Sequence, residues 1–293
     1  MRVQVCIPHY FREHADPGDN PNGYGSLRQG GLLARSIALG RCISSLLDLQ
    51  RRPETCLLNI SNRNIEHYNN SEEPLEISIC ICTDGIHTLK DVLDIYRNEI
   101  EVITLKPSSS SDLPLECRDH LINNYTEFDL LCYIEDDIII SDRLFFDKIL
   151  WFHEKTNHKL CLMPHRYECV NKENMEKLII DGPNFTGPNV ISQQRVAYGK
   201  FQETDHVWFD MANNPHSGSF TISQEQARKL RTRPQPRVGF LGPLETAATL
   251  TVLIRFPVLK PCQECWSFLR VEHGAPSFLY TINNLPHLSI DSP

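Results

Sequence analysis

The sequence predicts a single α/β domain with a mainly parallel sheet flanked by helices, followed by an irregular α+β half. Three observations support this prediction. The 293 residues, 41% of them hydrophobic and 23% charged, have the composition of a soluble globular protein that can bury a large core. Up to about residue 160, short apolar runs alternate with helical stretches, as they do in β-α-β units. Beyond that point proline, glycine and asparagine are frequent and the alternation is lost.

Hydrophobic patterns place the individual elements. Residues 2–7 form an apolar run that Pro8 ends, which is typical of a first strand. Leu33, Ile37 and Ile43 recur at helical spacing and predict an amphipathic helix around them. The expected strands cover residues 2–7, 77–82, 101–105 and 129–134, and the expected helices cover 32–49, 116–125, 143–153 and 246–254, with a further helix starting near Ser223.

Charge and composition exclude several classes of protein. Lysine and arginine total 29 against 37 acidic residues, and this net charge of −8 argues against nucleic acid as a partner. No run approaches 18 consecutive apolar residues, so we expect no transmembrane segment, and the N-terminal apolar run is too short for a secretory signal. The eleven cysteines are odd in number and many lie in apolar runs, as in proteins of a reducing compartment. We therefore expect a cytoplasmic protein.

Polar side chains follow three of the predicted strands directly. His9 and Tyr10 follow the first strand, Thr83 and Asp84 follow the second, and Glu135 begins an acidic triplet after the strand that ends at residue 134. Ligands of parallel α/β sheets bind beyond the carboxyl ends of the strands. These positions are therefore the first candidates for a functional site.

The acidic triplet Glu135, Asp136 and Asp137 lies between strongly apolar flanks, in LLCYIEDDIII. Carboxylates near a core need a cation or hydrogen-bond donors to compensate for lost hydration. On an extended chain, Glu135 and Asp137 would face one side and Asp136 the other. Such a pair of oxygen ligands suits Mg²⁺ or Mn²⁺ carrying a substrate phosphate. The alternative is a strand-to-helix turn in which aspartates cap the helix and face solvent.

This order of features resembles the nucleotide-sugar glycosyltransferases of the GT-A fold. In that family a strand ends in an acidic D-x-D-type motif that binds a divalent metal and the donor diphosphate. The resemblance covers most of the chain, although the first acidic residue of the motif is here Glu135. It implies a single Rossmann-type mixed sheet flanked by helices. Residues 1–140 would bind the nucleotide sugar, and residues 141–293 would form the acceptor-binding half of the same domain.

The resemblance also implies which residues bind the donor. His9 and Tyr10 would lie beside the base and ribose, although they also suit a buried edge of the core. Asp84 would accept hydrogen bonds from the base or ribose, although the sequence around it also suits a plain turn. Arg28 and Arg35 flank a glycine-rich stretch that suits phosphate, although arginines are common on helix surfaces. The implied donor-binding residues are Pro8, His9, Tyr10, Arg28, Asp84, Arg118 and Asp136.

The metal and catalytic residues follow from the same resemblance. Asp137 and Glu135 would bind Mn²⁺ or Mg²⁺. The family frequently supplies a late histidine to the metal, and His273, after an apolar run, is favoured over His287 near the terminus. Glu245 would be the general base toward the acceptor or would stabilise an oxocarbenium-like centre, although a glutamate there also favours the helix dipole.

The predicted reaction transfers a sugar from a nucleotide diphosphate donor to a hydroxyl of a saccharide or another acceptor. Both inversion and retention of configuration remain open. A metal-dependent nucleotidyltransferase would use a similar sheet and acidic cluster but would release pyrophosphate. A protein that binds carbohydrate or nucleotide sugar without turnover is the third alternative, and it would leave the acidic triplet without a purpose.

Overall fold

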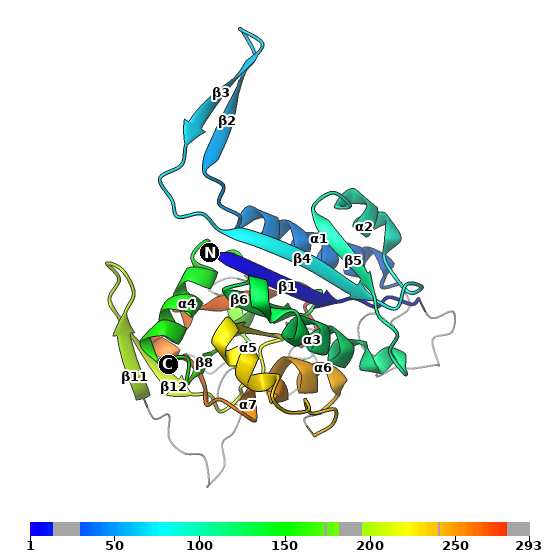
Figure 1. The fold of residues 1–293 in the computed structure, drawn as a ribbon, viewed down its shortest axis with the longest axis vertical. Helices are drawn as coiled ribbons and strands as arrows, with labels where there is room; N and C mark the ends of the chain where they lie inside the picture. Colours follow the sequence, from blue (N-terminus) through cyan, green and yellow to red (C-terminus); the bar gives the residue numbers. More distant parts are fainter. Residues whose placement is uncertain (14–29, 173–174, 182–194, 240, 280–293) are drawn as a thin grey trace.

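The computed structural model describes residues 1–13, 30–172, 175–181, 195–239 and 241–279 (Figure 1). A five-stranded sheet forms its centre, with the strand order β13-β6-β1-β4-β5. Neighbours among the four strands from β6 to β5 are parallel, and β13 runs antiparallel to β6. The sheet is therefore mixed, as the sequence predicted. Its strands are β1 (Arg2–Pro8), β4 (Glu76–Thr83), β5 (Ile100–Thr104), β6 (Leu130–Ile134) and β13 (Ser219–Ser223).

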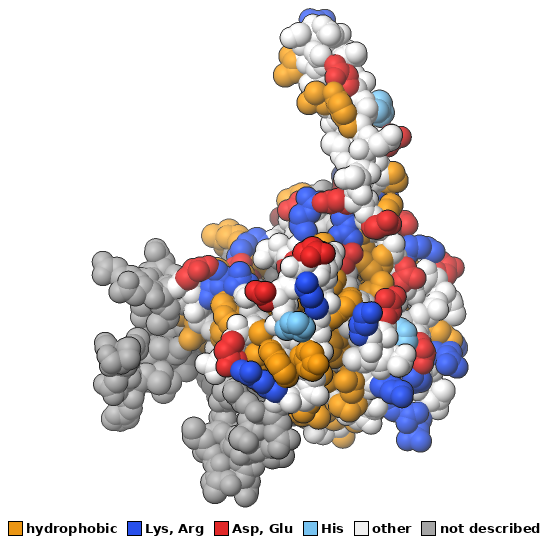
Figure 2. Space-filling view, turned by 90° about the vertical axis from the view of Figure 1, so that its left-hand side faces the viewer, with side chains coloured by type: hydrophobic (Ala, Val, Ile, Leu, Met, Phe, Trp, Pro, Cys, Tyr) orange, Lys and Arg blue, Asp and Glu red, His pale blue; other side chains and the backbone are white. Residues whose placement is uncertain are grey.

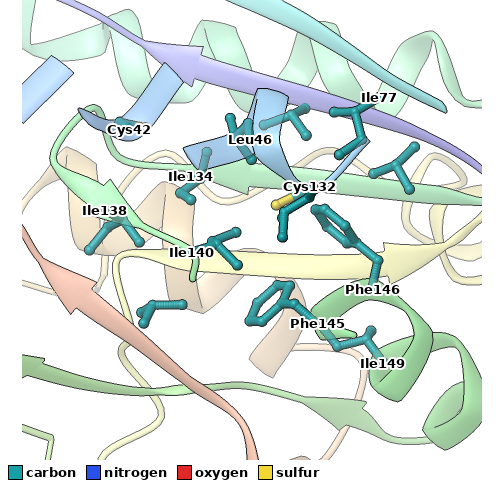
Figure 3. Close-up of a cluster of buried hydrophobic side chains, with 14 of the residues drawn as sticks. Cys42, Leu46, Ile77, Cys132, Ile134, Ile138, Ile140, Phe145, Phe146 and Ile149 are labelled. Atoms are coloured by element: carbon teal, nitrogen blue, oxygen red, sulfur yellow. The ribbon is translucent and has the colours of Figure 1, made fainter. Parts of the chain in front are cut away.

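Helices cover both faces of this sheet because successive side chains of a strand point to opposite sides. Cys132 and Ile134 of β6 belong to a buried cluster shared with α1, α2 and α4, which Figure 3 shows in part. Tyr133 belongs to a second cluster shared with α3, α5 and the helical stretch 243–253. The helices are α1 (Leu32–Asp48), α2 (Lys90–Ile95), α3 (Leu113–Asn123), α4 (Phe145–Lys155), α5 (Gln224–Leu230), α6 (Pro243–Glu245) and α7 (Thr251–Leu253), with a π-helical turn over Thr246–Leu250.

Two smaller sheets lie beside the carboxyl ends of the central strands. One has the order β10-β9-β15-β7 and the other β11-β12-β14-β8. Most of these strands come from the irregular half of the sequence, where the alternation of apolar and polar residues is too weak to predict them. Their bounds are β7 (Ile138–Ile139), β8 (Cys161–Leu162), β9 (His165–Lys172), β10 (Met175–Ile179), β11 (Arg195–Lys200), β12 (His206–Met211), β14 (Val258–Pro261) and β15 (Arg270–His273).

Most predicted elements of the first half are present, and their ends differ for local reasons. The helix expected from residue 116 begins at Leu113, where Pro114 suits the first turn because its missing N–H would be unsatisfied there in any case. Ser223 caps α5 through a reciprocal capping box with Gln226.

All eleven cysteines are free thiols. None of the helices in the described ranges is long and apolar enough to cross a membrane.

A β-hairpin of β2 (Glu54–Asn59) and β3 (Asn64–Asn69) projects from the body of the protein (Figures 1 and 2). The sequence analysis did not predict it. Its apolar side chains are exposed, with Leu58 at 65% and Ile65 at 59%, so it adds nothing to either buried cluster. At its base the N–H of Asn70 donates to the carbonyl oxygen of Pro53 at 2.7 Å.

We expect the body to fold without this hairpin. Replacing residues 54–69 by two glycines should shift the thermal unfolding midpoint by less than about 3 °C, roughly 1 kcal/mol, because no core contact is lost. In contrast, Leu46→Ala, at a fully buried position of α1, should cost about 2–5 kcal/mol. A deletion that destabilises the protein as much as Leu46→Ala would show that the hairpin is part of the core structure.

Candidate active site

The acidic triplet begins where β6 ends. The Glu135 N–H donates to the carbonyl oxygen of Gly218 at 2.9 Å, and the Ile138 N–H donates to the carbonyl oxygen of Glu135 at 3.1 Å. The second bond closes a turn, so the chain is no longer extended at the two aspartates. The expected alternation is therefore wrong here, because Asp136 and Asp137 both reach the same arginine, Arg35 of α1.

Asp136 is held by two buried partners. Its Oδ1 accepts a hydrogen bond from Arg35 Nη2, and its Oδ2 lies 2.7 Å from His9 Nδ1. Burial by itself raises the pKa of Asp136, but the positive charge of Arg35 and the hydrogen bond from His9 outweigh burial and hold this pKa at about 2. Asp136 therefore stays ionised and connects the ends of β1 and β6 to α1.

His9 lies beneath this edge of the sheet with an exposed fraction of 1%. Its Nε2 accepts a hydrogen bond from the Leu89 N–H at 3.0 Å, which assigns the ring proton to Nδ1 and makes that atom the donor to Asp136. Both ring nitrogens are thus engaged inside the protein. In this structure His9 organises the edge of the sheet on which the donor was predicted to lie.

Asp137 faces His273 across the turn. The pairing of β15 with β7 sets His273 opposite Ile138, and the Gly274 N–H donates to the Asp137 carbonyl oxygen at 2.6 Å. Asp137 Oδ2 accepts from Arg35 Nη1 at 2.8 Å and lies 3.6 Å from His273 Nε2. The other oxygen, Oδ1, is buried and has no hydrogen-bond partner among the described residues. This pair has one carboxylate oxygen and one ring nitrogen available for a further ligand.

Glu135 lies on the opposite side of the turn. Burial and then the charge of Asp137 raise the pKa of Glu135 to about 8, and the charge of Glu245 acts in the same direction. The charges of Arg166 and His273 oppose this rise. Like Asp137, Glu135 has a buried carboxyl oxygen, Oε1, without a hydrogen-bond partner in the described ranges. The carboxyl therefore retains its proton near neutral pH when no cation is bound.

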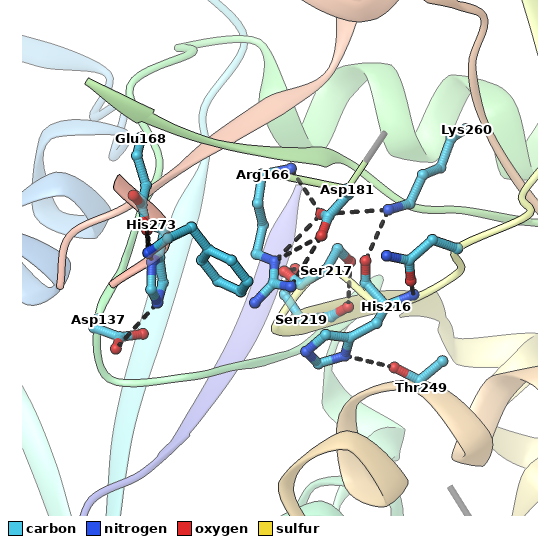
Figure 4. A network of polar contacts seen from close by, with 12 residues as sticks. Asp137, Arg166, Glu168, Asp181, His216, Ser217, Ser219, Thr249, Lys260 and His273 are labelled. Carbon is cyan, nitrogen blue, oxygen red and sulfur yellow. Dashed lines mark hydrogen bonds and ion pairs between the residues drawn. The ribbon is translucent and has the colours of Figure 1, made fainter. Parts of the chain in front are cut away.

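A buried network of charges includes Arg166, Asp181 and Lys260 (Figure 4), and the charge of Arg166 acts on Glu135. The Arg166 Nε and Nη2 atoms donate to Asp181 at 2.9–3.2 Å, and Lys260 Nζ lies 3.4 Å from the same carboxylate. Burial raises the pKa of Asp181, but Lys260 and Arg166 outweigh it and hold that pKa at about 2. Lys260 also donates to the carbonyl oxygen of His216, whose Nδ1 lies 2.8 Å from Thr249 Oγ1. This network fixes the loop that carries Gly218.

Glu245 begins the helical stretch 243–253. Its Oε2 accepts a hydrogen bond from the Gly242 N–H at 3.0 Å, so the carboxylate caps its own helix. Its charge still reaches Glu135, since it contributes to the raised pKa of that residue. The charges of the two glutamates predicted as base and ligand thus interact, although 110 positions separate them in the sequence.

The predicted base-binding residues gather at the ends of β1 and β4. Asp84 Oδ1 accepts hydrogen bonds from the Ile86 and His87 N–H groups, and its Oδ2 lies 2.6 Å from His87 Nδ1. The Tyr10 ring packs on the His87 ring, with 4.9 Å between the ring centroids. Asp84 therefore forms the turn that the alternative interpretation expected, and its half-buried side chain stays at the sheet edge.

The remaining predicted residues lie in α3, at the end of β1, or outside the described residues. Arg118 of α3 is fully buried, where it donates to the Pro236 carbonyl oxygen at 2.7 Å and pairs with Asp119. Pro8 is buried at the end of β1. Arg28 and the alternative histidine, His287, lie outside the described residues.

Sequence reasoning missed Arg166, Glu168, Asp181 and Lys260. Arg166 and Glu168 are two positions apart on β9, so they share a face of the strand. The only signal in the sequence is a pair of charges in the run HRYECV, which equally suits an exposed strand. Only the packing of β9 against β15 shows that these charges are buried beside the acidic triplet.

Gly218 is required by the geometry around Glu135. Its φ is +61°, and a Cβ at this position would lie 3.0 Å from Glu135 Oε2 and 3.1 Å from Ile138 Cδ1. We expect Gly218→Ala to destabilise the protein by about 2–4 kcal/mol in denaturant unfolding, through left-handed backbone strain and crowding. Gly30→Ala is the matched control, because Gly30 also has a positive φ but such a Cβ would meet no atom of the described residues within 4 Å. Equal losses in both variants would contradict crowding at Glu135.

The side chains at the turn have ligand atoms of the kind that bind a divalent cation. The described residues contain no group of three or more His, Cys, Asp or Glu side chains already arranged to hold a metal. The unpartnered oxygens of Asp137 and Glu135 and the Nε2 atom of His273 are nevertheless of the type that binds Mn²⁺ or Mg²⁺. The donor set fits such an ion, with Asp137 and His273 as the pair already facing each other.

Comparison with solved structures identifies the fold. Over 92% of its length the chain is similar to the structure of GalNAc-T7 with UDP, GalNAc and Mn²⁺, with a TM-score of 0.50, 12% identity and 43% of that chain covered. It also matches TarS 1-349 of S. aureus over 97% of this chain and 64% of that one, with a TM-score of 0.48 and 12% identity. The chain thus spans less than two thirds of either structure. No protein-family model and no curated protein matches the sequence.

The similarity to GalNAc-T7 shows that the chain has the GT-A fold, the fold of that glycosyltransferase. The predicted fold class is therefore confirmed. The acidic turn at the end of β6 occupies the place in the chain where the sequence predicted the metal-binding motif of this fold.

Proposed function

We propose that the protein is a metal-dependent glycosyltransferase that moves a sugar from a nucleotide diphosphate donor to a hydroxyl of its acceptor. One observation carries this proposal: Asp137 and His273 face each other at the carboxyl edge of the parallel strands, with 3.6 Å between Asp137 Oδ2 and His273 Nε2, and Asp137 Oδ1 has no hydrogen-bond partner among the described residues. The GalNAc-T7 structure of the same fold contains UDP, GalNAc and Mn²⁺, which supports the same ligand class here.

In this proposal Asp137, His273 and Glu135 would hold Mn²⁺ or Mg²⁺. The ion would supply positive charge to the donor diphosphate as it leaves. Asp136 would contribute to the site by holding Arg35 in position, since its two carboxylate oxygens already bind Arg35 and His9. The free thiols agree with a reducing compartment, and we propose a cytoplasmic location.

The two halves of the domain would have separate tasks. Residues 1–140 would hold the nucleotide sugar, with Tyr10 and Asp84 at the base or ribose. Residues 141–293 would hold the acceptor. Glu245, beside Glu135, would accept the proton of the attacking hydroxyl or stabilise an oxocarbenium-like centre.

The test is titration calorimetry with UDP, GDP, CDP and ADP, in Mn²⁺ and again in EDTA. We expect one diphosphate to bind, and only with the metal. The product formed from the matching nucleotide sugar then distinguishes the two enzyme classes, since a transferase releases the nucleoside diphosphate and a nucleotidyltransferase releases pyrophosphate. Absence of binding by all four diphosphates would contradict the proposal.

A further inference from the structure

Glu168 of β9 is a buried carboxylate that accepts four hydrogen bonds. Its side chain is fully buried. Its Oε1 accepts from His273 Nδ1 at 2.8 Å and from the N–H groups of Ser277 and Phe278 at 3.0 and 3.2 Å. Its Oε2 accepts from the Leu279 N–H at 2.8 Å. Burying an ion is costly unless donors surround it, and here one carboxylate joins a ring nitrogen to a backbone segment.

The carboxylate determines how the His273 ring is presented. Because an ionised carboxylate can only accept hydrogen bonds, Nδ1 must carry the ring proton. In the neutral ring, Nε2 then carries the lone pair, and Nε2 is the atom that lies 3.6 Å from Asp137 Oδ2 (Figure 4). The same bond fixes the plane of the ring. Metal-binding histidines commonly have a carboxylate in this position on their second nitrogen.

The backbone segment 277–279 depends on the same oxygens. Three consecutive N–H groups point at Glu168, as they do at an anion bound to the first turn of a helix. The ring of Phe278 also packs on His273, with 5.9 Å between the ring centroids. The orientation of His273 and the docking of this segment are therefore fixed by one side chain.

We propose that Glu168 is a positioning residue for the divalent metal, which holds His273 as the Nδ1–H tautomer and couples metal binding to the docking of residues 277–279. This inference rests on the proposed function, because that function supplies the metal. Because the coupling is reciprocal, a change that undocks residues 277–279 also lowers the affinity for the metal, and metal binding stabilises the docked segment. If Glu168 had only a structural role, it would stabilise the fold without affecting either the tautomer of His273 or the affinity for the metal.

The test compares Glu168→Gln with Glu272→Gln. Glutamine keeps the shape and one acceptor oxygen but removes the charge that excludes the other tautomer. Glu272 is the neighbour of His273 on β15, and it pairs with Arg41 at 2.9 Å. It therefore controls for the loss of one negative charge near the site. The readouts are Mn²⁺ affinity by calorimetry, with and without the nucleotide that binds, and the ¹⁵N shifts of the His273 ring in metal-free protein at a pH where the ring is neutral.

We expect Glu168→Gln to weaken Mn²⁺ binding by about 10–100-fold, and Glu272→Gln to change it by less than about 3-fold. The ring should be the Nδ1–H tautomer in the unmodified protein and a mixture in Glu168→Gln. A folded Glu168→Gln protein with unchanged Mn²⁺ affinity would overturn the inference and leave the proposed function intact. If Glu168→Gln fails to fold, the ¹⁵N shifts of the His273 ring in the unmodified protein provide the test. An Nε2–H tautomer in that protein also overturns the inference. Absence of Mn²⁺ binding by the unmodified protein would overturn both.

Discussion

Replacing Asp137 by asparagine is expected to abolish metal-dependent nucleotide binding and to lower the rate of sugar transfer by about 10²–10³-fold or more. Asp137 Oδ1 is buried without a hydrogen-bond partner in the described part of the chain, and Asp137 Oδ2 lies 3.6 Å from His273 Nε2. An amide has no net charge, and its nitrogen is a donor that repels a cation. The measurement is calorimetry of the bound nucleotide in Mn²⁺ and in EDTA, followed by initial rates.

The control for Asp137 is Asp142→Asn. Asp142 bonds to Lys148 of α4 and caps the turn before that helix, so it too is an aspartate with a cationic partner, although it is half-buried and Asp137 is buried. Its loss should affect stability alone. Thermal unfolding of both variants separates binding from folding, because Asp137 also accepts a hydrogen bond from Arg35. Mn²⁺-dependent binding that survives in a folded Asp137→Asn protein would show that the metal lies elsewhere.

The sequence predicts four of the five central strands and misses β13, and the three inner strands are marked by burial on both faces. β6 is a continuous apolar run, β1 and β4 are mostly apolar, and polar residues follow at the carboxyl ends of all three. The acidic triplet could therefore be located, and with it the neighbourhood of Asp84 and Tyr10. The β2–β3 hairpin could not be predicted in this way, because both of its faces are exposed and no core-facing alternation marks it.

The partners within the site were not predictable from local patterns. Asp136 and Arg35 are about 100 positions apart, and their contact depends on the docking of α1 beside β6. Glu168 and His273 meet because β9 and β15 pair in parallel, which neither segment alone indicates. The turn at Asp136 and Asp137 also brings both aspartates to Arg35, whereas an extended chain would have set them on opposite faces. Spacing arguments hold along an extended strand and fail at the turn that follows it, which is where the proposed chemistry lies.

The second prediction with a large expected effect concerns Arg35 and the free energy of unfolding. Arg35→Met removes the positive charge that binds Asp136 and Asp137 and leaves both carboxylates buried near each other. Breaking a buried ion pair on one side costs about 3–5 kcal/mol, so we expect a loss of that size at pH 7 in denaturant unfolding. Asp136→Asn combined with Arg35→Met should recover part of the loss, since the double variant no longer buries that charge.

The pH dependence of the Arg35→Met deficit identifies its cause. In the unmodified protein the pKa of Asp136 is about 2, below its value in the unfolded chain, so its contribution to stability is present above about pH 4 and is lost as the pH falls toward 2. Without Arg35 burial dominates and raises the pKa of Asp136, so folding then favours the protonated acid. The difference in unfolding free energy between the two proteins should therefore be largest near neutral pH and should shrink as the pH falls from the raised pKa of Asp136 in the variant toward 2. A deficit that stays constant over this range would assign the loss to the packing of the Arg35 side chain instead of its charge.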